Sequence, residues 1–166
     1  MKLNELVEKG YGNCEVKDGI MDFIVMPKKG KVYSIDELEY WQTIYSIISC
    51  GEVNVFDYRS NDYVKEKVNQ GNIFYDEESA KEEIKRREVC HKVEKYSYKF
   101  SKEEWGNDDV IKWYAYYNHF IERIDYSRCR HFQFQQLFFK SKNDIQTAIS
   151  EVGQGDFIKY FLGVEL

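Results

Sequence analysis

The candidate binding residues lie in one stretch of the sequence, between 113 and 130. This stretch interleaves aromatic rings with arginines. Trp, Tyr and Arg are the side chains that contribute most to binding energy at protein interfaces. Aromatic rings beside cations can also stack on bases and hold the backbone of a single-stranded nucleic acid. The set comprises Trp113, Tyr114, Tyr116, Tyr117, Arg123, Arg128 and Arg130.

The same pattern is compatible with a purely structural role. Alternate residues of a strand point to opposite faces, so part of Trp113–Tyr117 could form the core. The arginines could pair with carboxylates on the surface. One strand of a two-layer domain does not bury both faces, and we therefore expect some of these aromatic side chains to face outward.

The cysteines and histidines do not predict a metal site. Zinc sites usually take pairs of ligands two to four residues apart in both halves of the site. Cys90 and His91 are adjacent on an expected helix and point about 100° apart. Cys129 and His131 could share one face of a strand, but no second pair accompanies them. We expect no metal and no other cofactor.

Motifs of the common catalytic sites are missing from the sequence. It contains no Gly-x-Ser-x-Gly, no His-Glu-x-x-His and no glycine-rich phosphate loop. The carboxylates of Glu77, Glu78, Glu82 and Glu83 fall where a solvated helix face would place them. We therefore predict that the protein is not an enzyme, while a carboxylate site without a sequence signature stays open.

Composition limits the protein class. The chain has 166 residues, a net charge of −5, 43% hydrophobic residues and 17% aromatic residues. Disordered chains are poor in aromatics, so we expect a folded protein with a sizeable core. The acidic balance disfavours broad nucleic-acid binding and would suit a basic groove on a partner.

The N-terminal sequence and the cysteines indicate the compartment. No apolar segment follows Met1–Leu6, and no run approaches the ~18 apolar residues of a membrane span. The four cysteines are isolated from one another. We expect a cytosolic protein with reduced thiols and no membrane association.

Two similar local units position the candidate residues. In the first, Ile73–Tyr75 is an apolar strand, Asp76 an expected helix N-cap, and the helix runs to about 94–96. In the second, Ser141 follows Phe139 and caps a helix that Gly153 ends. The matching positions are Phe74 with Phe139, Asp76 with Ser141, Ala80 with Ile145, and Ile84 with Ile149.

Weaker patterns predict the remaining elements. Residues 34–49 are ambiguous: we predict a helical turn followed by a strand, and a single helix is the alternative. The expected elements are a helix at 3–9, a hairpin at 13–26, a helical turn at 34–39, strands at 41–48, 52–58, 110–117, 121–126 and 132–139, exposed connections at 59–70 and 97–108, and a last helix capped by Asp156.

These elements predict an α+β fold, with an antiparallel sheet and helices packed on one face. Residues 1–30 would form an N-terminal helix and hairpin, followed by two β-rich and helical halves at 31–96 and 97–166 within one compact domain. The halves could be pseudo-repeated β-β-β-α units from a duplication. Chance recurrence of a common unit explains the pattern equally well.

The first strand-cap-helix segment, together with the turn before it, resembles a group of small uncharacterised accessory proteins of phages and prophages of Gram-positive bacteria. The shared pattern is Gly71-Asn72-x-Phe74, a cap, an acidic residue and Ala80, preceded by the turn Gly51-Glu52-Val53. It departs from the group at Asp76, where Thr is usual, and at Ser79, where Glu is usual.

The C-terminal part resembles the same group in its aromatic strand at 137–139, its helix from Ile145 to Gly153 and its tail at 160–164. The resemblance covers roughly residues 40–166. It implies an origin in a mobile element and carries no catalytic residues.

Together these observations predict a non-enzymatic phage or mobile-element protein that binds and inhibits a host protein. The concrete version is an inhibitor of bacterial defence, such as an anti-CRISPR protein, whose partner could itself bind nucleic acid. The alternative is an aromatic-lined binder of nucleotides or single-stranded nucleic acid.

Overall fold

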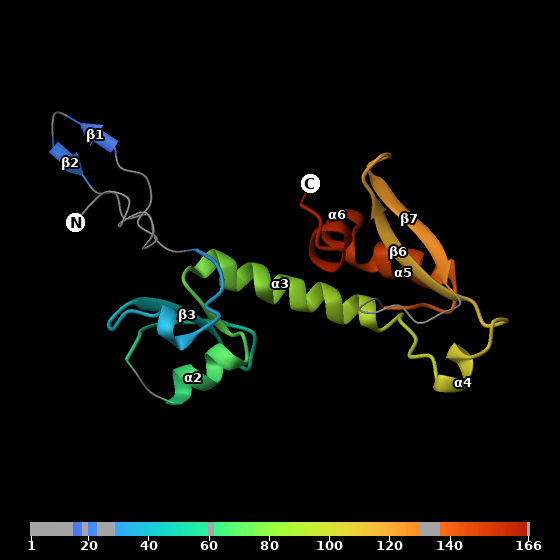
Figure 1. The fold of residues 1–166 in the computed structure, drawn as a ribbon, viewed down its shortest axis with the longest axis horizontal. Coiled ribbons are helices and arrows are strands. Elements are labelled where there is room, and N and C mark those ends of the chain that lie inside the picture. Colours follow the sequence, from blue (N-terminus) through green and yellow to red (C-terminus); the bar gives the residue numbers. More distant parts are fainter. Residues whose placement is uncertain (1–14, 18–19, 23–28, 60–61, 130–136, 166) are drawn as a thin grey trace. The chain divides into compact units, whose positions relative to one another are not determined.

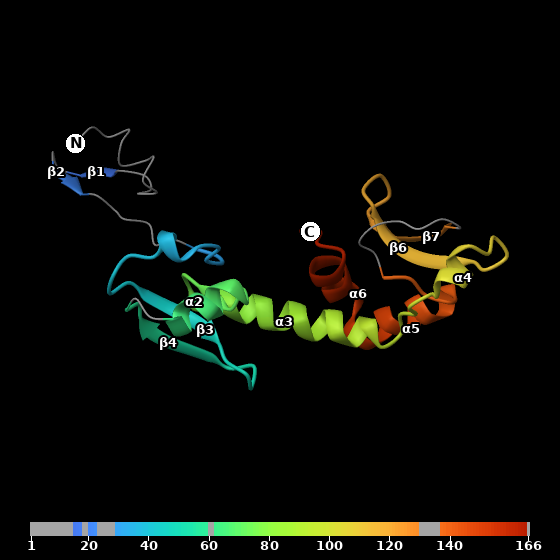
Figure 2. The ribbon, with the colours of Figure 1, turned by 60° about the horizontal axis from the view of Figure 1, so that its bottom comes forward.

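The computed structural model describes residues 15–17, 20–22, 29–59, 62–129 and 137–165 (Figures 1 and 2). Helices and antiparallel strands make up the fold, which confirms the α+β class. The chain divides into two compact units, Met1–Ile84 and Lys85–Leu166, which meet within one helix. The helix predicted at 3–9 lies outside the described residues. The predicted hairpin contains strands β1 (Glu15–Lys17) and β2 (Ile20–Asp22), which pair antiparallel.

The first unit is built on a three-stranded antiparallel sheet. Strands β3 (Thr43–Ile47), β4 (Val53–Asp57) and β5 (Ile73–Phe74) lie in the order β4-β3-β5. Within residues 34–49, which the structure describes throughout, the helical part is the short 3₁₀ turn η1 (Ile35–Glu37), and strand β3 follows it. The structure therefore confirms the helical turn followed by two strands and excludes a single helix over 34–49.

A helix that was not predicted covers one face of this sheet. Helix α2 (Asp62–Asn69) occupies most of the segment 59–70, which was wrongly predicted to be an exposed connection. Val64 and Val68 are spaced four residues apart and are buried with Ile44 and Ile73 of the sheet. Two apolar residues at helical spacing are enough to anchor so short a helix when a sheet offers an apolar face.

The opposite face of the same sheet receives the long helix α3 (Glu77–Glu94). Ala80 of α3 is buried with Ile47 and Phe74. Since Ile44 and Ile47 project to opposite faces of β3, helices α2 and α3 lie on opposite faces of the sheet.

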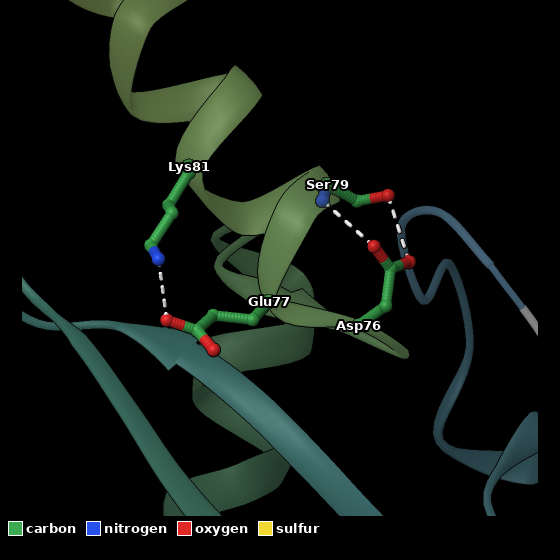
Figure 3. Close-up of polar contacts among 4 residues, drawn as sticks. All are labelled: Asp76, Glu77, Ser79 and Lys81. Atoms are coloured by element: carbon green, nitrogen blue, oxygen red, sulfur yellow. Dashed lines mark hydrogen bonds and ion pairs between the residues drawn. The ribbon is translucent and has the colours of Figure 1, made fainter.

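Asp76 begins α3, as predicted from its position after the strand. Its carboxylate accepts hydrogen bonds of 2.8 Å from the backbone N–H and from the hydroxyl of Ser79 (Figure 3). It also accepts a 2.8 Å bond from the Gly30 N–H. In the first turn of α3, the exposed side chains of Glu77 and Lys81 form an ion pair across 2.6 Å. Asp76 thus caps the helix and also holds the distant segment around residue 30.

The second unit is built on the hairpin of β6 (Lys112–Asn118) and β7 (Arg123–Cys129), which pair antiparallel (Figure 1). Helices cover one face of this hairpin, as predicted. They are the C-terminal part of α3, α5 (Lys142–Val152), the turn α6 (Gln154–Asp156) and the π-helical turn η2 (Phe157–Phe161). The buried residues between them are Val89, Val93, Ala115, Ile124, Phe139, Ile145, Ala148, Phe157 and Ile158.

The cap and the helix of the second strand-cap-helix segment form as predicted. Phe139 makes an isolated bridge to Trp113, and Ser141 caps α5 in a capping box with Asp144. The two matching strand-cap-helix segments, which begin at Phe74 and Phe139, therefore share their local construction. The sheets around them differ, because one has three strands and the other, within the described residues, has two. The structure does not show pseudo-repeated halves, and most of the predicted strand 132–139 lies outside the described residues.

Two further predictions about the second unit are wrong in part. The segment 97–108 contains the helical turn α4 (Lys102–Trp105), which Ser101 and Glu104 begin with a capping box. The last helical turn, η2, starts directly after Asp156 as predicted, but the Asp156 side chain makes no capping hydrogen bond, because the residue continues the helical backbone of α6 and its carboxylate lies 3.0 Å from the Lys85 ammonium. Over the described residues, every helix is too short or too polar to span a membrane.

Candidate functional site

The register of the β6–β7 hairpin divides the predicted binding residues between its two faces. Residues directly opposite each other in antiparallel strands share a face. Trp113 pairs with Arg128, and Tyr117 lies on the same face two pairs along. Tyr114, Tyr116 and Arg123 belong to the other face. Arg130 lies outside the described residues, so the structure does not bring the predicted set together as one surface.

The helix-covered face contributes mainly to the core. Trp113 and Tyr117 pack against the buried cluster that includes Ala115 and Ile124. The exposed Arg128 guanidinium lies over the Trp113 ring, 5.5 Å from its centroid. On this face, Trp113 and Tyr117 therefore fit a role in packing better than a role in binding.

The opposite face carries a continuous series of aromatic rings, which we call the aromatic row. Neighbouring rings lie 4.7–6.3 Å apart between centroids, mostly edge to face, as expected for rings that interact through their quadrupoles. Phe138 is buried in the middle and the other rings are half-buried. The row consists of Tyr98, Phe100, Trp105, Phe138, Tyr114 and Tyr116.

Both charge signs border the aromatic row. The exposed Lys140 ammonium lies 3.9 Å from the Tyr98 ring centroid. The Tyr98 hydroxyl donates to the Glu104 carboxylate across 3.3 Å, and the Tyr116 hydroxyl donates to Asp125 across 3.5 Å. A ligand on this face would meet carboxylates as well as cations.

Tyr116 stays protonated at neutral pH. Burial raises the pKa of its hydroxyl, and the Asp125 carboxylate raises it further by charge and by hydrogen bonding. The nearby Arg123 opposes this shift without cancelling it. The hydroxyl is therefore a hydrogen-bond donor rather than a nucleophile or base.

Lys112 is fully buried at the start of β6. Its ammonium donates to the Asn107 carbonyl across 3.1 Å and lies 5.3 Å from the Trp105 ring centroid. Opposite it on β7, burial raises the pKa of the Cys129 thiol, although the Lys112 charge acts in the other direction. Burial thus favours the thiol form of Cys129 over the thiolate, which is the reactive form.

Among the residues of the second unit that the structure describes, the most exposed large apolar side chains lie at the hairpin tip, residues 119–122. Phe120 is 100% exposed and Ile121 is 49% exposed. The tip has a defined backbone, since the Phe120 N–H donates to the Asn118 side chain across 3.1 Å and Glu122 has φ of 47°. His119 packs edge-on against Tyr117, 5.0 Å between centroids.

The sequence analysis missed Phe120. The segment His119-Phe120-Ile121 contains no Gly or Pro to mark a turn, so its apolar residues look like a continuation of a strand. The turn could be predicted only from the two strands on either side, because the chain must reverse direction within the few residues between them.

The described residues hold no group of three His, Cys, Asp or Glu side chains placed to bind a metal. Comparison of the chain with protein-family models, with curated proteins and with solved structures gives no match.

Proposed function

We propose that the protein acts by binding another protein, with the tip of the β6–β7 hairpin as its anchor. The observation that carries this proposal is the complete exposure of Phe120 beside the half-exposed Ile121. Burying such a side chain in a partner's pocket would contribute about 2 kcal/mol. An aromatic anchor on a defined turn also loses little conformational freedom on binding.

The aromatic row on the outward face of the hairpin extends this surface. Tyr114 and Tyr116 are half-buried, and Arg123 beside them is exposed. Such residues could form contacts around the anchor and exclude water from it. Trp113 and Tyr117 are not assigned to the interface because they pack against the core, and Arg128 is not assigned to it because its guanidinium lies over the Trp113 ring.

The partner that we propose is a host protein, and the concrete version is a component of a bacterial defence system that this protein inhibits. This part of the proposal rests on the resemblance to phage and prophage accessory proteins and on the net charge of −5. No enzymatic step is needed for inhibition of this kind.

Affinity capture tests the proposal. The full chain, immobilised through a terminal tag, is incubated with lysate of a Gram-positive host, and bound proteins are quantified by mass spectrometry. We expect one protein to be retained in a near-stoichiometric amount and to elute with free chain. Recovery of no such protein from lysates that contain active defence systems would contradict the proposal.

The second candidate function is binding of nucleotides or single-stranded nucleic acid on the aromatic row. The observation that favours it is the cation of Lys140 over the Tyr98 ring. The carboxylates of Glu104 and Asp125 on the same face disfavour binding of nucleic acid, because they repel phosphates.

A fluorescence titration decides this second function. Trp105 belongs to the aromatic row, so a stacked base should quench tryptophan emission. Binding of an oligonucleotide should also weaken as salt rises. We expect a flat titration with an octamer of thymidylate in 50 mM salt. Saturable quenching that Lys140→Gln removes would instead establish the nucleic-acid function.

A further inference from the structure

A second exposed aromatic cluster lies in the first unit, at the end of the β3–β4 ladder. Tyr40 is 62% exposed and Trp41 is 54% exposed. Their rings meet edge to face, 5.3 Å between centroids. Arg59 follows β4, and its guanidinium lies 4.2 Å from the centroid of the Trp41 ring. We call these three residues the Trp41 cluster.

The backbone of Trp41 has a conformation that large side chains rarely adopt. Its φ is 69°, in the left-handed region that favours glycine and asparagine. The Trp41 N–H donates to the Tyr58 carbonyl across 2.9 Å, and the Tyr58 N–H donates to the Gln42 carbonyl across 2.7 Å. These bonds hold the strained residue in place. Strained residues of this kind often belong to binding sites, because stability alone would favour glycine there.

The stacked arginine keeps its hydrogen-bonding edge available. Arg59 is exposed, and among the described residues its guanidinium packs on the face of the Trp41 ring. A guanidinium that lies against a ring keeps its N–H groups in the plane of its edge. That edge matches the two oxygens of a carboxylate, and the stacking removes part of the entropy cost of holding the fork.

We propose that the Trp41 cluster binds a segment of a partner protein that presents one carboxylate next to an apolar side chain. Arg59 would take the carboxylate through its two-pronged edge, and the rings of Tyr40 and Trp41 would take the apolar side chain. This site lies in the first unit and does not depend on the function proposed for the hairpin tip.

The surrounding charges favour a protein segment over a nucleic acid. Glu39 and Asp57 are exposed and lie two residues from Trp41 and Arg59 in the sequence. A chain of phosphates would meet these carboxylates as well as the single arginine. A segment with a single carboxylate meets this repulsion at one group, whereas a polyanion meets it at every phosphate, and the net charge of −5 adds to the repulsion of a polyanion.

The test follows the indole resonances of the full chain labelled with ¹⁵N-tryptophan. The chain has three tryptophans, and Trp41→Phe assigns the resonance of Trp41. The probes are acetyl-Leu-Glu-Leu-amide and its uncharged match, acetyl-Leu-Gln-Leu-amide, with a thymidylate octamer as the nucleic-acid probe. We expect the acidic peptide alone to shift the Trp41 resonance saturably, with the resonances of Trp105 and Trp113 unmoved.

Variants define the role of Arg59. Arg59→Gln should weaken binding of the acidic peptide at least tenfold, and Arg59→Lys should weaken it nearly as much because lysine lacks the fork. Lys65→Gln makes the same charge change at an exposed position of α2 and should bind like the wild type, and so should Phe120→Ser. The proposal is overturned if the two peptides act alike, if neither moves the resonance, if Arg59→Gln binds normally, or if the octamer binds more tightly than the acidic peptide.

Discussion

At the scale of single residues, Asp76 joins two parts of the first unit. Its carboxylate accepts bonds from the N–H and hydroxyl of Ser79 and from the N–H of Gly30, 46 residues away in the sequence. Burial has the largest effect on its pKa and raises it, but the hydrogen bonds and the Lys29 charge together outweigh burial and lower it. The ionised carboxylate is therefore the form that the folded state favours.

Asp76→Ala should lower the free energy of unfolding by about 1–2 kcal/mol, because it removes the cap and leaves the Gly30 N–H without this acceptor. Chemical denaturation followed by circular dichroism measures the change. Glu77→Gln is the matched control, since Glu77 is exposed and its ion pair with Lys81 contributes little. An equal loss in both variants would contradict the assigned role.

The lowered pKa also gives a pH dependence with a definite sign. A carboxyl whose pKa is lower in the folded state stabilises the fold above its unfolded pKa of about 3.9, and this contribution is lost as pH falls further. The difference in stability between wild type and Asp76→Asn should therefore shrink below about pH 4. A difference that grows on acidification would contradict this reasoning.

At the scale of secondary structure, the sequence predicts elements whose signals are local. Asp76 and Ser141 identify their helices because N-capping depends on a side chain and the N–H groups just after it. Residues 41–48 and 52–58 are rich in β-branched and aromatic residues, and strands β3 and β4 lie within them. In these cases propensity and tertiary packing favour the same structure.

The sequence does not predict features that depend on tertiary packing. Helix α2 has a mostly polar surface, and only Val64 and Val68 show its apolar face, so composition alone favours a loop. For the predicted binding residues on β6 the limit is different. Which aromatics face the helices depends on strand register, and the exposure of Phe120 depends on where the hairpin turns. Neither is a property of the local sequence.

Val64→Ala tests whether α2 is part of the core. Val64 is fully buried, so removing two methyl groups should lower the free energy of unfolding by about 2 kcal/mol. Val55→Ala is the control, because Val55 on β4 is 54% exposed and its truncation should cost less than about 0.5 kcal/mol. Equal effects in urea unfolding would show that α2 does not anchor the sheet.

At the scale of the whole molecule, each unit has its own core and its own exposed aromatic group. The first carries the Trp41 cluster, and the second carries Phe120 and Ile121 at the hairpin tip. If both proposed contact surfaces bind one partner, the avidity exceeds either single affinity, whereas two different partners would each be held by one surface alone.

The affinity of Phe120→Ser for the captured partner tests the central proposal most directly. Phe120 is fully exposed, so the variant should keep wild-type stability while its Kd rises at least tenfold, which corresponds to a loss of about 1.4 kcal/mol. Tyr33→Ser, which truncates a 79% exposed aromatic elsewhere, should bind like the wild type. An unchanged Kd for Phe120→Ser, measured by calorimetry with a folded variant, would contradict the proposal that the hairpin tip anchors binding.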